Sequence, residues 1–137
     1  MTNPPITGGC LCGALRYEVS GAPGAMGHCY CEDCRKASGS GFIPFMMVPA
    51  PQLRITGAVL THSKLLQNGR HADRNSCAVC GGLVFGGILG KTEQHTIYAG
   101  SLDDPTLFKP AIAINVQGRP DWALVPEGLT QFLRMPE

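Results

Sequence analysis

The chain has few charged residues and no concentration of charge of one sign. Only 15% of its 137 residues are Asp, Glu, Lys or Arg, the formal net charge is +1, and no block of Lys and Arg occurs. A nucleic-acid-binding surface or a contact with an anionic membrane needs a local excess of positive charge. The composition therefore argues against both classes of partner.

Long apolar runs are also absent. No segment approaches the roughly 20 consecutive apolar residues that a membrane-spanning helix requires. No positively charged segment followed by an apolar one stands near the N-terminus, so we expect neither a membrane span nor a secretory signal. A chain of 137 residues is long enough for one hydrophobic core, and we predict a single domain over residues 1–137.

The sequence has no sustained helical period. Its 18 glycines and 11 prolines interrupt it every few residues, and short β-rich runs between such breaks predict an all-β fold. One short helix is expected at Glu32–Ser38, because Gly39 is suited to a C-terminal cap. The expected strands are Leu15–Val19, Phe42–Val48, Leu53–Ile55, Val59–Leu66, Leu83–Phe85, Thr96–Ala99 and Ala111–Val116.

Cysteine, in contrast, is abundant and is arranged in three motifs. C-x-C and C-x-x-C spacings present two thiolates to one soft metal ion. Four thiolates complete a tetrahedral zinc site, and three leave one position for a water or a substrate. The motifs are Cys10-x-Cys12, Cys29-x-Cys31-x-x-Cys34 and Cys77-x-x-Cys80, which contain all seven cysteines.

The odd number of cysteines favours metal binding over a disulfide framework. Secreted disulfide scaffolds usually carry an even number, whereas cytosolic C-x-C and C-x-x-C pairs are more often metal ligands. We therefore predict a cytoplasmic, metal-binding protein. A redox pair at Cys31 and Cys34 is the weaker alternative, because such a motif normally opens a helix in a βαβ unit, which this pattern lacks.

The spacing also predicts local geometry. Residues i and i+2 of a strand point to the same face, so we expect Cys10 and Cys12 to share one strand face, and Cys29 and Cys31 another. The segment 77–82 is typical of a tight turn. A metal shared by residues 10, 12, 77 and 80 would join the start of the chain to its second half, so its binding energy would stabilise the fold.

These motifs resemble those of the glutathione-dependent formaldehyde-activating family, also called the CENP-V/GFA family. The resemblance rests on the segments Gly8–Val19, Cys29–Gly39 and Cys77–Gly81, together with Ala99–Pro105 and Gly118–Trp122. It implies an Mss-four-like fold, in which twisted antiparallel β sheets are organised around zinc. It further implies a structural zinc at Cys10, Cys12, Cys77 and Cys80, and a second zinc with an open position at Cys29, Cys31 and Cys34.

The activity that the resemblance implies is the condensation of formaldehyde with glutathione to S-hydroxymethylglutathione, a carbon–sulfur lyase reaction in the reverse sense. The partner that the resemblance implies is a small-molecule thiol such as glutathione. Arg35 and Lys36 are candidates to bind its carboxylates, with a solvated helix face as the alternative; Arg16 and Arg74 are weaker candidates. Tyr30 departs from the family pattern, which often has histidine there.

Three alternatives stay open at this point. One interpretation makes His28 a general base or a partner that orients a metal ligand. We favour the other interpretation, in which His28 is a strand residue that faces away from Cys29. The three-cysteine cluster has two alternatives to a zinc site with an open position. It would be a second structural zinc site completed by a side chain such as His28, or a site that is often empty. The rival function is a non-enzymatic zinc-binding module of the same fold, used for interaction or metal buffering.

Overall fold

The structure is a computed structural model, and it describes residues 4–136. It consists mostly of β structure with one α-helix, α1 (Glu32–Ser38), and short 3₁₀ turns. None of the described helices is long and apolar enough to cross a membrane. The strands are β1 (Ile6–Gly9), β2 (Arg16–Val19), β3 (Met26–Cys29), β4 (Ile43–Pro49), β5 (Leu53–Thr56), β6 (Val59–Leu65), β7 (His71–Cys77), β8 (Leu83–Gly86), β9 (Gln94–Tyr98), β10 (Ile112–Ile114) and β11 (Thr130–Gln131).

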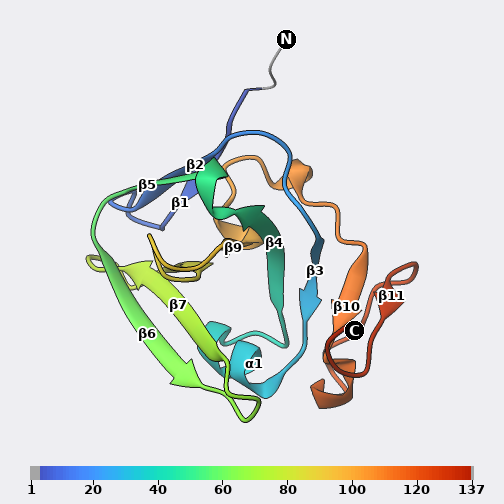
Figure 1. Cartoon of the computed structure of the whole chain (residues 1–137). Coiled ribbons are helices and arrows are strands. Elements are labelled where there is room, and N and C mark those ends of the chain that lie inside the picture. The colour runs from blue at the N-terminus through green and yellow to red at the C-terminus, as the bar shows by residue number, and fades with distance from the viewer. Residues whose placement is uncertain (1–3, 137) are drawn as a thin grey trace.

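The strands form two sheets. The smaller sheet has the order β1-β2-β5, and the larger one has the order β11-β10-β3-β4-β9-β8-β7-β6. Pairing is antiparallel except that β10 runs parallel to both β3 and β11. In Figure 1 the larger sheet curls, so that β6 and β7 lie on one side and β10 and β11 on the other. Helix α1 lies between the lower ends of β7 and β3 in this view.

The main core lies where the two sheets pack together. Tyr17 of β2, Met46 of β4 and Phe85 of β8 are fully buried in it, with apolar residues of β9 and the following turn. A second, smaller cluster surrounds Tyr30 beside β10. Burial of large apolar side chains is the dominant stabilising term of such a core.

The predicted all-β class with one short helix is confirmed. The helix has the predicted bounds, its N-terminus is capped by Cys31, and Gly39 closes it in the left-handed conformation with φ 74°. Each predicted strand is present, with ends that differ by at most two residues. The strands β1, β7 and β11 were not predicted, and β3 was expected only as a strand around Cys29, without bounds. β7 was missed because its sequence His71–Cys77 is mostly polar, although Asn75 is buried and hydrogen-bonded to the main chain of β8.

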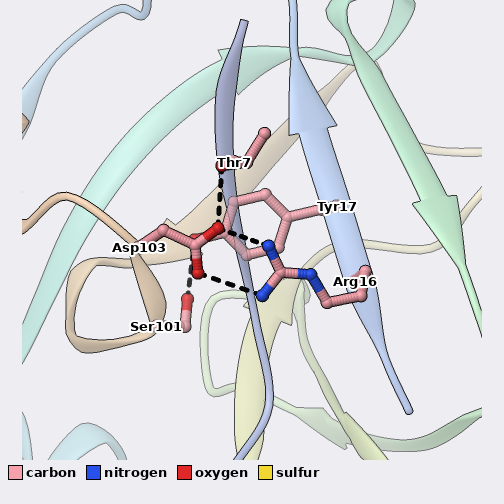
Figure 2. A network of polar contacts seen from close by, with 5 residues as sticks. All are labelled: Thr7, Arg16, Tyr17, Ser101 and Asp103. Carbon is pink, nitrogen blue, oxygen red and sulfur yellow. Dashed lines mark hydrogen bonds and ion pairs between the residues drawn. The ribbon is translucent and has the colours of Figure 1, made fainter. Parts of the chain in front are cut away.

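A polar network fastens the small sheet to the turn after β9 (Figure 2). Arg16 forms a two-fold contact with Asp103, in which Nη1 donates to Oδ1 at 3.0 Å and Nη2 donates to Oδ2. Thr7 Oγ1 also donates to Asp103, at 2.8 Å, and the hydroxyl of Tyr17 lies 2.8 Å from that of Ser101. Burial raises the pKa of Tyr17 to about 12. The network therefore anchors the ends of β1 and β2, between which the first two cysteines lie.

Candidate metal centres

The four-cysteine cluster is formed by two turns that lie far apart in the sequence. The sulfur atoms of Cys10, Cys12, Cys77 and Cys80 all lie within 4.8 Å of one another. The prediction that Cys10 and Cys12 share a strand face is wrong, because β1 ends at Gly9 and both residues lie in the turn that follows. Cys77 ends β7, and Cys80 lies in the tight turn predicted before β8.

The geometry of this cluster suits zinc. The Sγ atoms of Cys10 and Cys12 are 3.6 Å apart, and those of Cys12 and Cys77 are 3.8 Å apart. A zinc–sulfur bond of about 2.3 Å places the sulfurs of a tetrahedral site about 3.8 Å apart. Two of the separations are close to this value and all of them are within 4.8 Å, so the four thiols converge as the ligands of a single zinc ion do.

Main-chain N–H groups supply the hydrogen bonds to the sulfurs of the four-cysteine cluster. The hydrogen bond from the Leu15 amide is the main cause that lowers the pKa of Cys10 to about 6. Main-chain donors of this kind favour thiolates and orient them. The donors are Ala14 to Cys12 at 3.5 Å, Leu15 to Cys10 at 3.3 Å, Val79 to Cys77 at 3.3 Å and Cys80 to Cys77 at 3.4 Å.

The three-cysteine cluster lies where β3 gives way to α1. Cys29 ends β3 and is buried, Cys31 is the N-cap of the helix, and Cys34 lies in its first turn. Their sulfurs also lie within 4.8 Å of one another. The prediction that Cys29 and Cys31 share one strand is wrong, because the strand ends at Cys29. Instead the Cys31 sulfur caps the helix and accepts a hydrogen bond from the Cys34 amide at 3.2 Å.

Within residues 4–136, no histidine, carboxylate or fourth cysteine joins this second cluster. Hydrogen bonds from the thiols of Cys29 and Cys34 lower the pKa of Cys31 to about 2. Contacts with the thiols of Cys29 and Cys31 raise the pKa of Cys34. Cys31 is therefore the first of the three thiols to ionise, and three cysteines at one point are a donor set that suits zinc.

His28 does not complete the second cluster. Its ring is buried, stacks on Phe42 with centroids 4.2 Å apart, and has Nδ1 3.3 Å from the hydroxyl of Tyr30. Burial lowers the pKa of His28, which keeps it neutral. The Tyr30 hydroxyl donates to the carbonyl of Leu124 at 3.0 Å. Both side chains face the smaller core cluster, so the preferred interpretation of His28 as a residue facing away from Cys29 agrees with the structure.

A cleft of about 350 Å³ runs beside the three-cysteine cluster, between α1 and the strands β6 and β7. Lys64 of β6 reaches across it and contacts Asp33 of α1 at 2.5 Å. Arg74 of β7 lies on its wall, and its Nη2 donates to the Cys34 sulfur at 3.6 Å. Its lining also includes Lys36, His62 and the apolar side chain of Leu60. Arg74 is therefore the cation of this cleft that contacts the sulfur cluster, and Lys36 and Lys64 line the same cleft.

The predicted thiol-binding cations occupy different environments. Lys36 lines the cleft, is exposed, and pairs with Glu32 one helical turn earlier at 2.9 Å. Arg35 is half-buried and does not line the cleft; its Nε is buried without a hydrogen-bond partner. Arg16 belongs to the network of Figure 2, on the small sheet. Of these candidates, the structure brings Lys36 and Arg74 to the cluster's cleft.

Two residues near the second cluster were missed. Asn115, which follows β10, donates from Nδ2 to the Cys29 sulfur at 3.3 Å. Tyr98 of β9 is close enough to Cys34 and Cys29 for their charge to influence it, and burial raises its pKa. No motif marks either residue, because each reaches the cluster only through strand pairing. An asparagine directly after a short apolar run is the one local signal, since Asn tolerates left-handed backbone.

We compared the chain with known protein families and with solved structures. The family model described as glutathione-dependent formaldehyde-activating enzyme matches residues 5–118. The chain belongs to this family. Three solved chains match, among them a Rhodobacter sphaeroides protein of 18% sequence identity, with a TM-score of 0.55 over 92% of this chain and 98% of that one. That likeness shows the fold alone, and no curated protein matches the chain. Family membership agrees with the two cysteine clusters, which can hold metal ions.

Proposed function

We propose that this protein is a zinc-dependent carbon–sulfur lyase or synthase that joins a small thiol to an aldehyde, such as glutathione to formaldehyde. The observation that carries the proposal is the cluster of Cys29, Cys31 and Cys34, which lacks a fourth ligand from the described residues and adjoins a cleft lined by cations. A closed structural site has four protein ligands, whereas a catalytic zinc site keeps a position for substrate. The family description supports the same chemistry.

The three cysteines would hold zinc in this second site. Bound zinc supplies a Lewis acid that keeps a coordinated thiol deprotonated at neutral pH. The substrate sulfur then attacks the carbonyl carbon of the aldehyde. One carbon–sulfur bond forms, the carbonyl π pair moves to oxygen, and that oxygen takes up the proton that the thiol released. The product is a hemithioacetal, which for formaldehyde is the S-hydroxymethyl derivative of the thiol. The reverse sequence releases thiol and aldehyde.

The cleft would bind the remainder of the thiol substrate. Lys36 and Lys64 line it and can pair with carboxylates, and Arg74 also lines it and contacts Cys34. Glutathione carries two carboxylates, and cations beside the metal would hold them through charge-assisted hydrogen bonds. Arg35, which does not line the cleft, would contribute charge rather than direct contact. The proposed substrate class is therefore a thiol with at least one carboxylate.

The alternative is a non-enzymatic zinc-binding module of the same fold, for interaction or metal buffering. The tips of the two turns that form the four-cysteine cluster favour it, because Leu11 is 94% exposed and Val79 is 75% exposed. Exposed apolar side chains on a rigid metal turn suit contact with another protein. A thermal-shift series with glutathione separates the two, since an enzyme of this type is stabilised by its ligand and an interaction module is not.

The deciding experiment is an exchange measurement by NMR with ¹³C-formaldehyde and glutathione, in which the enzyme accelerates interconversion of free and thiol-bound formaldehyde. The wild-type protein should accelerate exchange above the uncatalysed rate. Cys31→Ser should abolish that acceleration while retaining the fold, since Cys31 is a ligand outside the main core. Ser40→Ala, an exposed change after the same helix, is the matched control. Unchanged exchange in Cys31→Ser would contradict the proposal.

A further inference from the structure

Each sulfur of the three-cysteine cluster accepts an N–H hydrogen bond, and the three donors come from different parts of the fold. The amide of Cys34 donates to Cys31 at 3.2 Å, Nδ2 of Asn115 donates to Cys29 at 3.3 Å, and Nη2 of Arg74 donates to Cys34 at 3.6 Å. Two of these donors are side chains. They contrast with the four-cysteine cluster, where the donors are main-chain amides.

The backbone at Asn115 is arranged to deliver its donor. Asn115 has φ 56° and ψ 36°, and within residues 4–136 it is the only residue other than glycine with a positive φ. Ile114 pairs with Cys29 across the parallel strands β10 and β3, which brings the next side chain over the sulfur. Left-handed backbone is unfavourable for most residues and collects at functional sites, where the surrounding structure compensates for it.

The second side-chain donor, Arg74, brings a full positive charge to the sulfur of Cys34. Its Nε is buried and has no hydrogen-bond partner among the described residues, so the guanidinium is only partly satisfied by the Cys34 sulfur. The neighbouring strand contributes little bulk, because Gly86 lies opposite Arg74 in the β7–β8 register. Arg74 thus faces both the sulfur cluster and the cleft.

We propose that Asn115 and Arg74 are positioning residues that make Cys29 and Cys34 poor nucleophiles, so that reaction is directed to the substrate sulfur in the fourth position. An N–H donor draws electron density from a thiolate and orients it, and such outer contacts tune metal sites. None of the three N–H hydrogen bonds described is made to the fourth position, so a substrate sulfur bound there would not receive any of them. This inference rests on the proposed function, since it assigns a chemical reason for two residues beside the same site.

The test measures the reactivity of each cysteine in the zinc-loaded protein, without glutathione or aldehyde. Iodoacetamide labelling is followed over time, and the rate at each cysteine is read by mass spectrometry after digestion. Asn115→Gly is the first variant, because glycine keeps the left-handed backbone while it removes the amide donor. We expect labelling of Cys29 to accelerate severalfold, with Cys31 unchanged because its donor is a main-chain amide.

Arg74→Met should produce the complementary pattern, with faster labelling at Cys34 and little change at Cys29. Arg74→Lys, which keeps the charge in a different shape, should restore part of the protection, and the exposed Arg54→Met is the matched control. Zinc retention is followed in parallel with a chromogenic chelator, and we expect affinity for the second zinc to fall about tenfold or more in Asn115→Gly.

Two outcomes would overturn the inference: unchanged rates at Cys29 and Cys34, or equal acceleration at all three cysteines, which would indicate general loosening of the site. Neither outcome depends on turnover. A failure of the labelling pattern with normal thiol–aldehyde exchange would therefore reject this inference alone. The expected labelling pattern without any exchange activity would reject the proposed function instead.

Discussion

The two cysteine clusters differ in how the fold supports their sulfurs. Main-chain amides of two tight turns supply the donors in the four-cysteine cluster, with distances of 3.3–3.5 Å. In the three-cysteine cluster two of the three donors are side chains, Asn115 and Arg74, and a cleft lies alongside. A turn supplies main-chain donors whatever its side chains are, whereas side-chain donors require particular residues at particular positions.

This difference indicates a division of labour. The four-cysteine cluster joins the turn after β1 to the end of β7, and the buried Cys77 sulfur belongs to the main core. The three-cysteine cluster lies beside α1, and none of the residues of that helix is fully buried. Loss of the first cluster should therefore damage the fold, and loss of the second should damage chemistry. The following predictions test this comparison, from the largest expected effect to the smallest.

Cys77→Ser should cause the largest loss of stability of any single change at the clusters. Structural zinc contributes about 10–16 kcal/mol of apparent binding free energy, which is comparable to the whole stability of a domain, about 5–15 kcal/mol. We expect Cys77→Ser to lose cooperative thermal unfolding followed by circular dichroism, while Cys31→Ser keeps it. Equal loss in both variants would remove the distinction between the clusters.

Raising the pH should destabilise the side of the fold that holds the four-cysteine cluster. Burial raises the pKa of Tyr17 from 10.0 to about 12, so the unfolded chain loses this proton first. The protonated Tyr17 hydroxyl therefore contributes about 3 kcal/mol to the free energy of unfolding. This contribution is fully present below pH 10 and is lost as the pH rises through about 12. Urea unfolding of wild type and Tyr17→Phe across this range measures it: the pH dependence should be smaller in the variant, and identical curves would contradict the assignment.

Removing the cleft cations should change substrate selection and leave the fold intact. In the double variant Lys36→Met/Lys64→Met, we expect KM for glutathione to rise about tenfold, which corresponds to about 1.4 kcal/mol. KM for 2-mercaptoethanol, which has no carboxylate, should stay the same. Lys91→Met, an exposed lysine outside the cleft, is the matched control. An equal rise in KM for both thiols would show that the cleft does not recognise carboxylates.

Acid should weaken the network of Figure 2 slightly. Hydrogen bonds from Arg16 and then from Thr7 lower the pKa of Asp103 below its ordinary value of 3.8. Its contribution is therefore present above pH 4 and is lost as the pH falls through the lowered pKa. Because the pair is exposed, the effect should be close to the limit of a thermal-unfolding measurement. Asp103→Asn should remove it, and a large effect would mean that this network carries more of the fold than its exposure suggests.

Sequence patterns were informative wherever local chemistry determined the structure. The helix after Cys31 ends at a glycine that takes left-handed backbone, and the cysteine spacing marks both clusters. β7 was missed because its sequence is mostly polar and has no apolar face. Arg74 and Ser76 line the cleft, and Asn75 is the buried residue between them. The positions of Arg74 and Asn115 depend on strand pairing between distant segments, which local patterns do not contain.

The departure at Tyr30 illustrates the same limit. The sequence marks Tyr30 only as a departure from the family pattern, and the structure shows its side chain buried in the smaller core cluster, just after β3 ends at Cys29. The turn geometry at Cys10 and Cys12 was predicted wrongly as a strand, because i and i+2 residues converge equally well on a tight turn. The convergence of the sulfurs was therefore predictable, whereas the backbone that produces it was not.

The most direct test of the division between the clusters is stepwise zinc removal from the native protein. Zinc released by increasing chelator is counted per chain while circular dichroism reports the fold. The account predicts two zinc ions per chain, the first released with loss of thiol–aldehyde exchange but with the fold retained, and the second released together with unfolding. A single zinc per chain, or exchange activity that survives release of the first zinc, would contradict it.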